Sequence, residues 1–159
     1  MQAITHPGTG RSPGAAADLK QWRSAIAQGN RAFEKEDYVR AARHYRLARS
    51  IADRLFGFAD EVDAGVAALV IAHHNLADTY ERLGQFSEQG SQLCAVHERL
   101  CRSVDDRGLN EPWRSAALRH SRRTYVELVR FAGRQPEHAR ARAALSLGAA
   151  GPGPESPAH

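Results

Sequence analysis

A chain of 159 residues is long enough to form one domain with a substantial core and too short to predict two. Its formal net charge of +4 is carried almost entirely by arginine, because Lys20 and Lys35 are the only lysines. A field this weak does not indicate a nucleic-acid-binding domain, and we interpret most arginines as solvated residues on helix surfaces. The two cysteines, Cys94 and Cys101, are too few for the disulfide framework of a small secreted protein.

The two ends of the chain differ in composition from its middle. Residues 1–16 and 148–159 are rich in Gly, Pro and Ser and show no hydrophobic period, which predicts a disordered arm and a disordered tail around a helical domain at 17–147. The first residues contain no apolar run that could be the core of a signal peptide, and no stretch approaches the ~20 apolar residues that cross a bilayer. We therefore expect a soluble cytoplasmic protein without a membrane partner.

Apolar residues at spacings of three and four predict a series of helices. Asp18, Asp37 and Asn110 are suited to cap helix N-termini, and Gly57 and Gly84 are suited to end helices. The predicted helices lie at about 18–36, 38–56, 62–83, 85–104, 111–132 and 137–147, with the fourth starting at Gln85 or Ser87.

Three of these helices have well-defined apolar stripes. In 38–56 small alanines alternate with larger residues, so a second, antiparallel helix can approach closely. Such a hairpin cannot bury its apolar face alone and needs a neighbouring hairpin. The predicted stripes are Ala41, Ala42, Tyr45, Ala48, Ile51, Ala52 and Leu55 in the second helix, Phe86, Leu93, Val96, Leu100 and Val104 in the fourth, and Trp113, Ala116, Ala117, Tyr125, Leu128, Val129 and Phe131 in the fifth.

A motif in the third predicted helix has the most specific spacing in the chain. His73, Leu76, Ala77 and Tyr80 have the spacing of the W-x2-L-G-x2-Y motif, and Phe86 follows the next turn. This pattern resembles that of tetratricopeptide repeats. The resemblance implies an all-α fold in which antiparallel helical hairpins stack as a short right-handed solenoid with a C-terminal capping helix.

The sequence departs from the repeat pattern in three ways. Gly29 and Ala77, which take equivalent small-residue positions, lie 48 residues apart, so the first hairpin needs longer helices or a longer connection than a 34-residue repeat. Gln89 stands where the family has a small alanine, and a third repeat built around Tyr125 is degenerate. The layout also resembles a small uncharacterised bacterial family of tetratricopeptide-like proteins in which an H-N-L-A motif follows an apolar run, which implies no particular activity.

The resemblance further implies a concave groove lined by the first helix of each hairpin. Family members that grip the C-terminal carboxylate of a peptide use asparagine and basic residues there, and Asn30 fits such a position. Acidic residues interrupt the positive charge, so we expect a mixed-charge groove that binds an unidentified protein or peptide. The alternative is a set of ordinary solvated polar residues. The predicted groove residues are Asn30, Glu34, His74, Asn75, Asp78, Arg82, Arg119 and Arg123.

A second candidate site comprises Cys94, His97 and Cys101. Offsets of three and seven residues place these side chains on one side of a helix, and thiolates with an imidazole suit zinc or copper. A tetrahedral site needs a fourth ligand, which another histidine would have to supply. The alternative is two buried cysteines beside a partly exposed histidine. His73 occupies the position of a large packing residue in the resembled family, so we predict a core role for it, whereas His74 could be a groove residue or a pH-sensitive contact.

The C-terminal third carries many arginines and few acidic residues. Such a surface could contact phosphates, which makes a nucleic-acid-associated protein a further alternative. Against it, the nearby aromatic residues lie on the predicted apolar stripe and no nucleic-acid-binding motif is present. The arginines are Arg114, Arg119, Arg122, Arg123, Arg130, Arg134, Arg140 and Arg142.

No catalytic motif is apparent, since the chain has no Gly-rich phosphate loop, no G-x-S-x-G elbow and no H-E-x-x-H sequence. We therefore predict a non-enzymatic adaptor or regulatory scaffold that binds a protein segment and needs no cofactor. A metal-responsive protein is the alternative from another class. Homodimerisation is also open, because a short stack of repeats leaves large end surfaces.

Overall fold

The computed structural model describes residues 13–148, and within that range the chain is all-α, with six helices and no strand. Consecutive helices pack against each other, and α3 also packs against α5. The helices are α1 (Pro13–Glu34), α2 (Tyr38–Leu55), α3 (Val62–Arg82), α4 (Phe86–Val104), α5 (Glu111–Arg134) and α6 (Ala139–Gly148).

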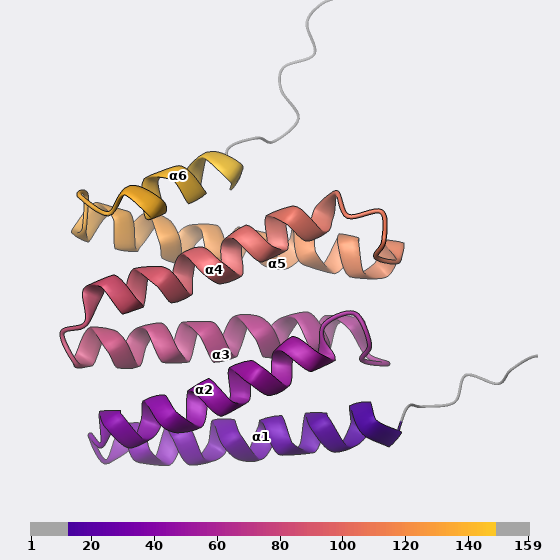
Figure 1. Ribbon diagram of the computed structural model, residues 1–159, viewed down its shortest axis with the longest axis horizontal. Helices are drawn as coiled ribbons and strands as arrows, with labels where there is room; N and C mark the ends of the chain where they lie inside the picture. The colour runs from indigo at the N-terminus through magenta and orange to yellow at the C-terminus, as the bar shows by residue number, and fades with distance from the viewer. Residues whose placement is uncertain (1–12, 149–159) are drawn as a thin grey trace, which may run out of the picture.

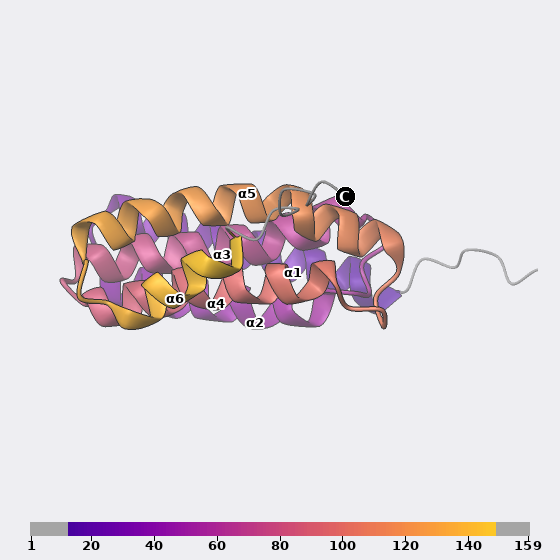
Figure 2. The same cartoon turned by 90° about the horizontal axis from the view of Figure 1, so that it is seen from above.

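The six helices form two layers. Figure 1 shows α2, α4 and α6 on the viewer's side and α1, α3 and α5 behind them. Seen from above, the same helices separate into a lower and an upper layer (Figure 2). We call these the even layer (α2, α4, α6) and the odd layer (α1, α3, α5). Because each connection is short, neighbours in the sequence run antiparallel and alternate between the layers.

Two equivalent turns reverse the chain after α1 and after α3. Glu36 and Gly84 both have positive φ, at 59° and 70°. Each turn closes with a backbone bond from the next residue to the carbonyl five positions earlier, as in a Schellman motif: Asp37 N to Ala32 O at 2.9 Å, and Gln85 N to Tyr80 O at 2.8 Å. The Asp37 side chain then accepts a bond from the Arg40 amide at 3.2 Å, so the predicted N-cap is confirmed.

These two turns explain the long spacing seen in the sequence. Glu36 and Gly84 are 48 residues apart, the same distance that separates Gly29 and Ala77. The extra length lies in α2 and α3, with 18 and 21 residues, and in the connector that follows Leu55. Gly57 in that connector has a φ of 92°, which favours glycine and ends α2 as predicted.

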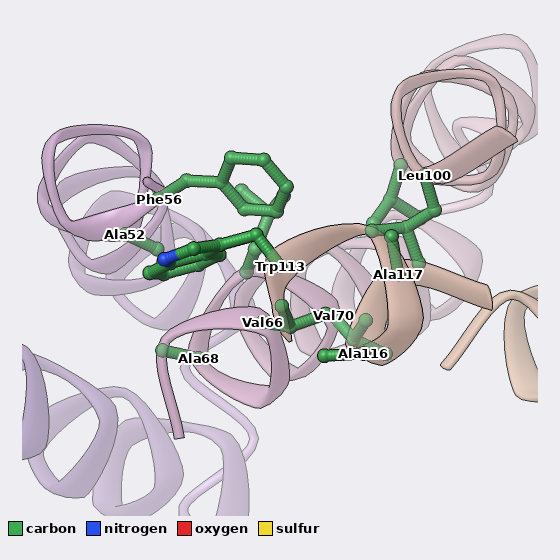
Figure 3. Packing of buried hydrophobic residues seen from close by; sticks show 11 residues of the cluster. Ala52, Phe56, Val66, Ala68, Val70, Leu100, Trp113, Ala116 and Ala117 are labelled. Carbon is green, nitrogen blue, oxygen red and sulfur yellow. The ribbon is translucent and has the colours of Figure 1, made fainter. Parts of the chain in front are cut away.

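The largest core cluster joins α2, α3, α4 and α5 around Trp113. The Trp113 ring packs on Phe56 with 5.1 Å between ring centroids (Figure 3). A Cβ atom at Gly65 would lie 2.6 Å from the tryptophan ring, so α3 can pass Trp113 only with glycine at this position. The seven residues predicted to be buried in α2 are all buried, which confirms that stripe.

Other predictions for individual residues are wrong. The first helix begins at Pro13, so Asp18 lies inside it and does not cap it. Phe86 and Val129 are 45% and 43% exposed, although both were predicted on apolar stripes. Thr124 is fully buried instead, because its hydroxyl finds partners inside the protein. The predicted arm and tail lie mostly outside the described residues.

Candidate binding face on the odd layer

A hollow open to solvent lies between α1 and the start of α3. Its volume is ≈ 290 Å³, and its lining includes Leu19 and Arg23 of α1 and Ala64 and Gly65 of α3. Leu19, Arg23 and Asn30 follow the helical spacing of one face of α1, so this face continues from the hollow toward the C-terminal end of the helix. We call the surface that runs from the hollow past Asn30 to Asp78 the odd-layer face.

Tyr45 fixes the polar end of the odd-layer face. It reaches from α2 to α1, where a Cβ atom at Gly29 would lie 2.4 Å from its ring, so only glycine admits the aromatic side chain. The Tyr45 hydroxyl donates a hydrogen bond to Asn30 Oδ1 at 2.6 Å. Burial, together with the charges of Asp78 and Glu34, raises the pKa of Tyr45 to about 12, so the hydroxyl remains a donor at neutral pH.

Asp78 lies next to this pair, on α3. Loss of hydration, together with the negative charges of Glu127 and Glu81, raises its pKa to about 6, although the residue as a whole is exposed to solvent. Arg82 and Arg123 act in the opposite direction without forming an ion pair with it. Within residues 13–148 no basic side chain lies within ion-pair distance of Asp78. Asp78 is therefore a carboxylate that the fold leaves short of stabilising partners.

His74 lies beneath this part of the surface and is only 7% exposed, so the prediction that it is an open groove residue is wrong. Its Nε2 atom is buried and has no hydrogen-bond partner among the described residues. Burial, together with the positive charge of Arg123, lowers the pKa of His74 to about 4. The residue is therefore neutral at pH 7 and packs as part of the interior.

The remaining predicted groove residues are spread along the layer. Glu34 and Arg82 lie near the Asn30 end, where the Arg82 guanidinium is 5.7 Å from the centre of the Phe33 ring. Asn75 is half-buried, and its backbone carbonyl accepts a hydrogen bond from the Thr79 hydroxyl at 2.8 Å. Arg119 pairs with Asp63 at 3.4 Å, near the opposite end of α3. Since a helix rises 1.5 Å per residue, that pair lies roughly 20 Å from Asp78.

The structure does not gather Cys94, His97 and Cys101 into one site. Cys94 is buried against α5 and α6, whereas Cys101 Sγ lies 3.5 Å from His97 Nε2. Between residues 13 and 148 no three His, Cys, Asp or Glu side chains are placed to hold one metal ion. This arrangement gives no support to the metal-responsive alternative.

Hydrogen bonding explains why His97 is buried. The Thr124 hydroxyl donates to the Ser121 carbonyl at 3.0 Å, so its oxygen accepts from His97 Nδ1 at 2.8 Å. The proton on Nδ1 leaves Nε2 free to accept from the Cys101 thiol. Burial lowers the pKa of His97 and raises that of Cys101, which keeps both groups neutral. The set is a satisfied polar contact inside the core.

Four of the eight arginines at the C-terminal end pair with carboxylates, and in three of these pairs the carboxylate belongs to another helix. Arg134 pairs with Glu81 at 2.9 Å, and Arg140 makes two hydrogen bonds to Glu98 at 3.0 and 2.9 Å. These contacts connect α5 to α3 and α6 to α4. Arg130 pairs with Glu127 within α5 itself. About half of the positive charge that suggested phosphate contact is therefore paired within the fold.

Sequence reasoning missed two residues of the odd-layer face. Tyr45 was assigned only to the apolar stripe of its helix, yet its hydroxyl orients Asn30. Glu127 was not considered, although it acts on Asp78 from α5. Gly29, a glycine inside α1, was the available signal for a close aromatic contact.

The fold defines an all-α protein of alternating antiparallel helices whose odd layer carries the candidate face. The chain belongs to the protein family of unknown function DUF2753, whose sequence profile matches residues 20–150. No curated protein and no solved structure matches the chain. Of the helices between residues 13 and 148, none has the length and apolar character needed to cross a membrane.

Proposed function

We propose that this protein is a non-enzymatic adaptor or regulatory scaffold that binds an extended segment of a partner protein along the odd-layer face. In this proposal the helices form a short right-handed stack like that of tetratricopeptide repeats, and the odd-layer face is its concave groove. The alternation of helices between two layers is consistent with such a stack.

Asp78 is the observation that carries the proposal. A carboxylate whose pKa is raised to about 6 is ionised at neutral pH at a cost, since burial and like charges oppose its charge. A lysine or arginine of a bound segment, or its backbone N–H groups, would supply the favourable interaction that the fold withholds. The Asn30 side chain, held by Tyr45, is placed to bond the backbone of the same segment.

The hollow at the other end suits a different part of the segment. Its lining combines apolar residues such as Leu19 and Ala64 with the charged residues Arg23, Asp60 and Glu61. From Gly65 to Asp78 the helix rises roughly 20 Å, a distance that an extended segment of about six residues spans. The face would therefore recognise a short stretch with an apolar residue at one end and a basic residue at the other.

Affinity capture from native cell extract, followed by quantitative mass spectrometry, tests this proposal. The bait is the full chain, compared with Asp78→Asn/Arg123→Gln on the odd-layer face. The matched control is Glu88→Gln/Arg43→Gln, which changes the same charges at exposed positions of the even layer. We expect a protein that is retained by wild type and by the control and lost by the odd-layer variant.

The binding segment can then be located with overlapping 15-residue peptides of the captured protein. In fluorescence anisotropy titrations the best peptide should bind the odd-layer variant at least tenfold more weakly than wild type. The proposal fails if the odd-layer variant and the control capture the same proteins with equal yield, or if no wild-type capture is above background.

Homodimerisation through an end of the stack stays a prediction. Leu118, Val126 and Val129 are exposed on α5, the last helix of the odd layer, where a further helix would otherwise pack. Arg122 lies among them on the same face of the helix.

A further inference from the structure

A separate pair of joined hollows lies on the even layer, between α2 and α4. Helix α3 lies behind this space and supplies its floor (Figure 1). The first hollow has a volume of ≈ 390 Å³ and the second ≈ 310 Å³, and Arg99 and Arg102 line both. We call the combined feature the even-layer groove.

One end of the even-layer groove contains an arginine without a carboxylate partner. Arg49 of α2 is half-buried, and its guanidinium donates to Gln92 Oε1 of α4 at 2.9 Å. The same oxygen accepts a bond from His73 Nδ1 at 3.1 Å, which places His73 at the floor. None of the seven ion pairs of the described chain involves Arg49. Its charge is therefore met only by a neutral amide.

Further positive charge follows along α4. Arg99 pairs with Asp53 across the groove and lies 4.5 Å from the centre of the Phe56 ring. Arg102, one turn further, is exposed and has no carboxylate within 4 Å in the part of the chain that the structure describes. Asp53 and Asp106 are the acidic residues that line the two hollows, against three arginines. The groove therefore has excess positive charge.

The pKa of the His73 imidazole responds to this positive charge. Burial, together with the positive charges of Arg49 and Arg99, lowers this pKa to about 4. A bound anion would oppose the effect of these arginines, because its negative charge favours the protonated imidazole. The His73 imidazole therefore provides an internal probe of whether an anion occupies the groove.

We propose that the even-layer groove binds an acidic segment of a partner protein through its aspartate or glutamate carboxylates. Arg49, Arg99 and Arg102 are distributed along two joined hollows, an arrangement that suits several carboxylates on an extended chain better than one compact anion. Guanidinium groups bind carboxylates through paired, charge-assisted hydrogen bonds. Phe56 and Leu109 at the far end offer apolar surface to the methylene groups of such a segment.

This inference goes beyond the proposed function, because the groove lies on the opposite layer and shares no residue with the odd-layer face. Two binding surfaces of opposite charge preference would allow one scaffold to hold two protein segments at once. Each surface can also be tested without the other.

The test uses fluorescein-labelled decaglutamate as the probe and the full chain, in anisotropy titrations at 50 and 300 mM NaCl. We expect Arg49→Gln/Arg102→Gln to weaken binding at least tenfold at the lower salt concentration. Arg43→Gln, an exposed arginine on α2 outside the groove, should stay within twofold of wild type. Asp53→Asn should strengthen binding at least twofold, because it removes an internal competitor for Arg99.

Two further measurements separate this inference from the proposed function and from an effect of unfolding. Asp78→Asn/Arg123→Gln should bind decaglutamate as wild type does, so failure on the odd-layer face would not affect this result. The NMR titration of the His73 imidazole should move to higher pH when decaglutamate is bound. Circular dichroism shows whether each variant is folded, and if the double variant is not, Asp53→Asn decides the question.

Several outcomes would overturn the inference. An equal loss for Arg43→Gln and the double variant would mean that decaglutamate responds only to net charge. No gain for Asp53→Asn would mean that the groove does not hold the peptide. If a ten-nucleotide single-stranded DNA bound more tightly than decaglutamate with the same dependence on Arg49 and Arg102, the ligand would be a nucleic acid.

Discussion

Each of the two surfaces of this protein contains a titratable side chain whose charged form is disfavoured by its surroundings, a histidine in one case and an aspartate in the other. On the even layer, His73 is a base surrounded by arginines, and its pKa is lowered to about 4. On the odd layer, Asp78 is an acid whose pKa is raised to about 6 by burial and by the charges of Glu127 and Glu81, which outweigh Arg82 and Arg123. Both residues belong to α3, five positions apart, so the central helix of the fold serves both surfaces. The comparison shows that burial favours the neutral form of each group and that the neighbouring charges strengthen this effect.

The largest expected effect comes from a substitution in the hydrophobic core between the two surfaces. Leu76 is fully buried on α3 in the cluster that contains Tyr45. Leu76→Ala should lower the free energy of unfolding by about 2–5 kcal/mol, because it removes buried methyl groups and leaves a cavity. Leu47→Ala, at a position that is 54% exposed, should cost less than about 0.5 kcal/mol. Urea unfolding followed by circular dichroism measures both, and equal costs would contradict this account of the core.

Lowering the pH should decrease the free energy of unfolding, because the buried His73 must become protonated. The pKa of His73 is 6.5 when unfolded and about 4 when folded, so the stability it contributes is present above pH 6.5 and is lost as the pH falls toward 4. At about 1.4 kcal/mol per pKa unit, the loss is about 3 kcal/mol. His73→Gln should therefore lose about 2 kcal/mol less than wild type between pH 7 and pH 4.5 in urea unfolding, because pH 4.5 lies above the folded pKa and part of the effect is not yet reached. His44→Gln keeps the three buried histidines, His73, His74 and His97, and should retain the wild-type loss. A loss in His73→Gln that matches wild type would refute the prediction.

The hydroxyl that organises the odd-layer face should have a smaller effect. Tyr45→Phe keeps the ring against Gly29 and removes the hydrogen bond to Asn30. We expect a loss of about 1 kcal/mol in unfolding free energy, the typical net value of one such bond. Tyr38→Phe is the matched control, since the Tyr38 hydroxyl has no hydrogen-bond partner among residues 13–148. Chemical denaturation of the pair would disprove the role of the hydroxyl if the two losses were the same.

Asp78 should produce the smallest effect and the opposite pH dependence to His73. Because its folded pKa is raised from 3.8 to about 6, its ionised form opposes folding, and this opposition disappears as the pH falls from 6 toward 4. Asp78→Asn should therefore have a higher melting temperature than wild type at pH 7.5 and the same one at pH 4. The gain should be small because solvent screens a partly exposed carboxylate. Glu88→Gln serves as the control, and a lower melting temperature for Asp78→Asn at pH 7.5 would contradict the assignment.

Some features of the fold follow from local sequence patterns, whereas others depend on how the helices pack. The stripe of α2 and the turns at Glu36 and Gly84 could be predicted, because helical periodicity and turn chemistry are local properties. The exposure of Val129 and the burial of Thr124 could not, since both depend on which neighbour covers each side of α5. The same holds for Arg119, whose partner Asp63 lies 56 residues earlier in the chain.

The sequence by itself determined an all-α chain, the approximate positions of its six helices and the turns near Glu36 and Gly84. The tertiary structure alone decided which polar residues meet. It placed Arg49, His73 and Gln92 from three helices in one contact and left Asp78 without an ion-pair partner among the described residues. The physical reason is that hydrophobic periodicity is a property of one helix, whereas desolvation and charge interactions depend on distances between helices that only packing sets.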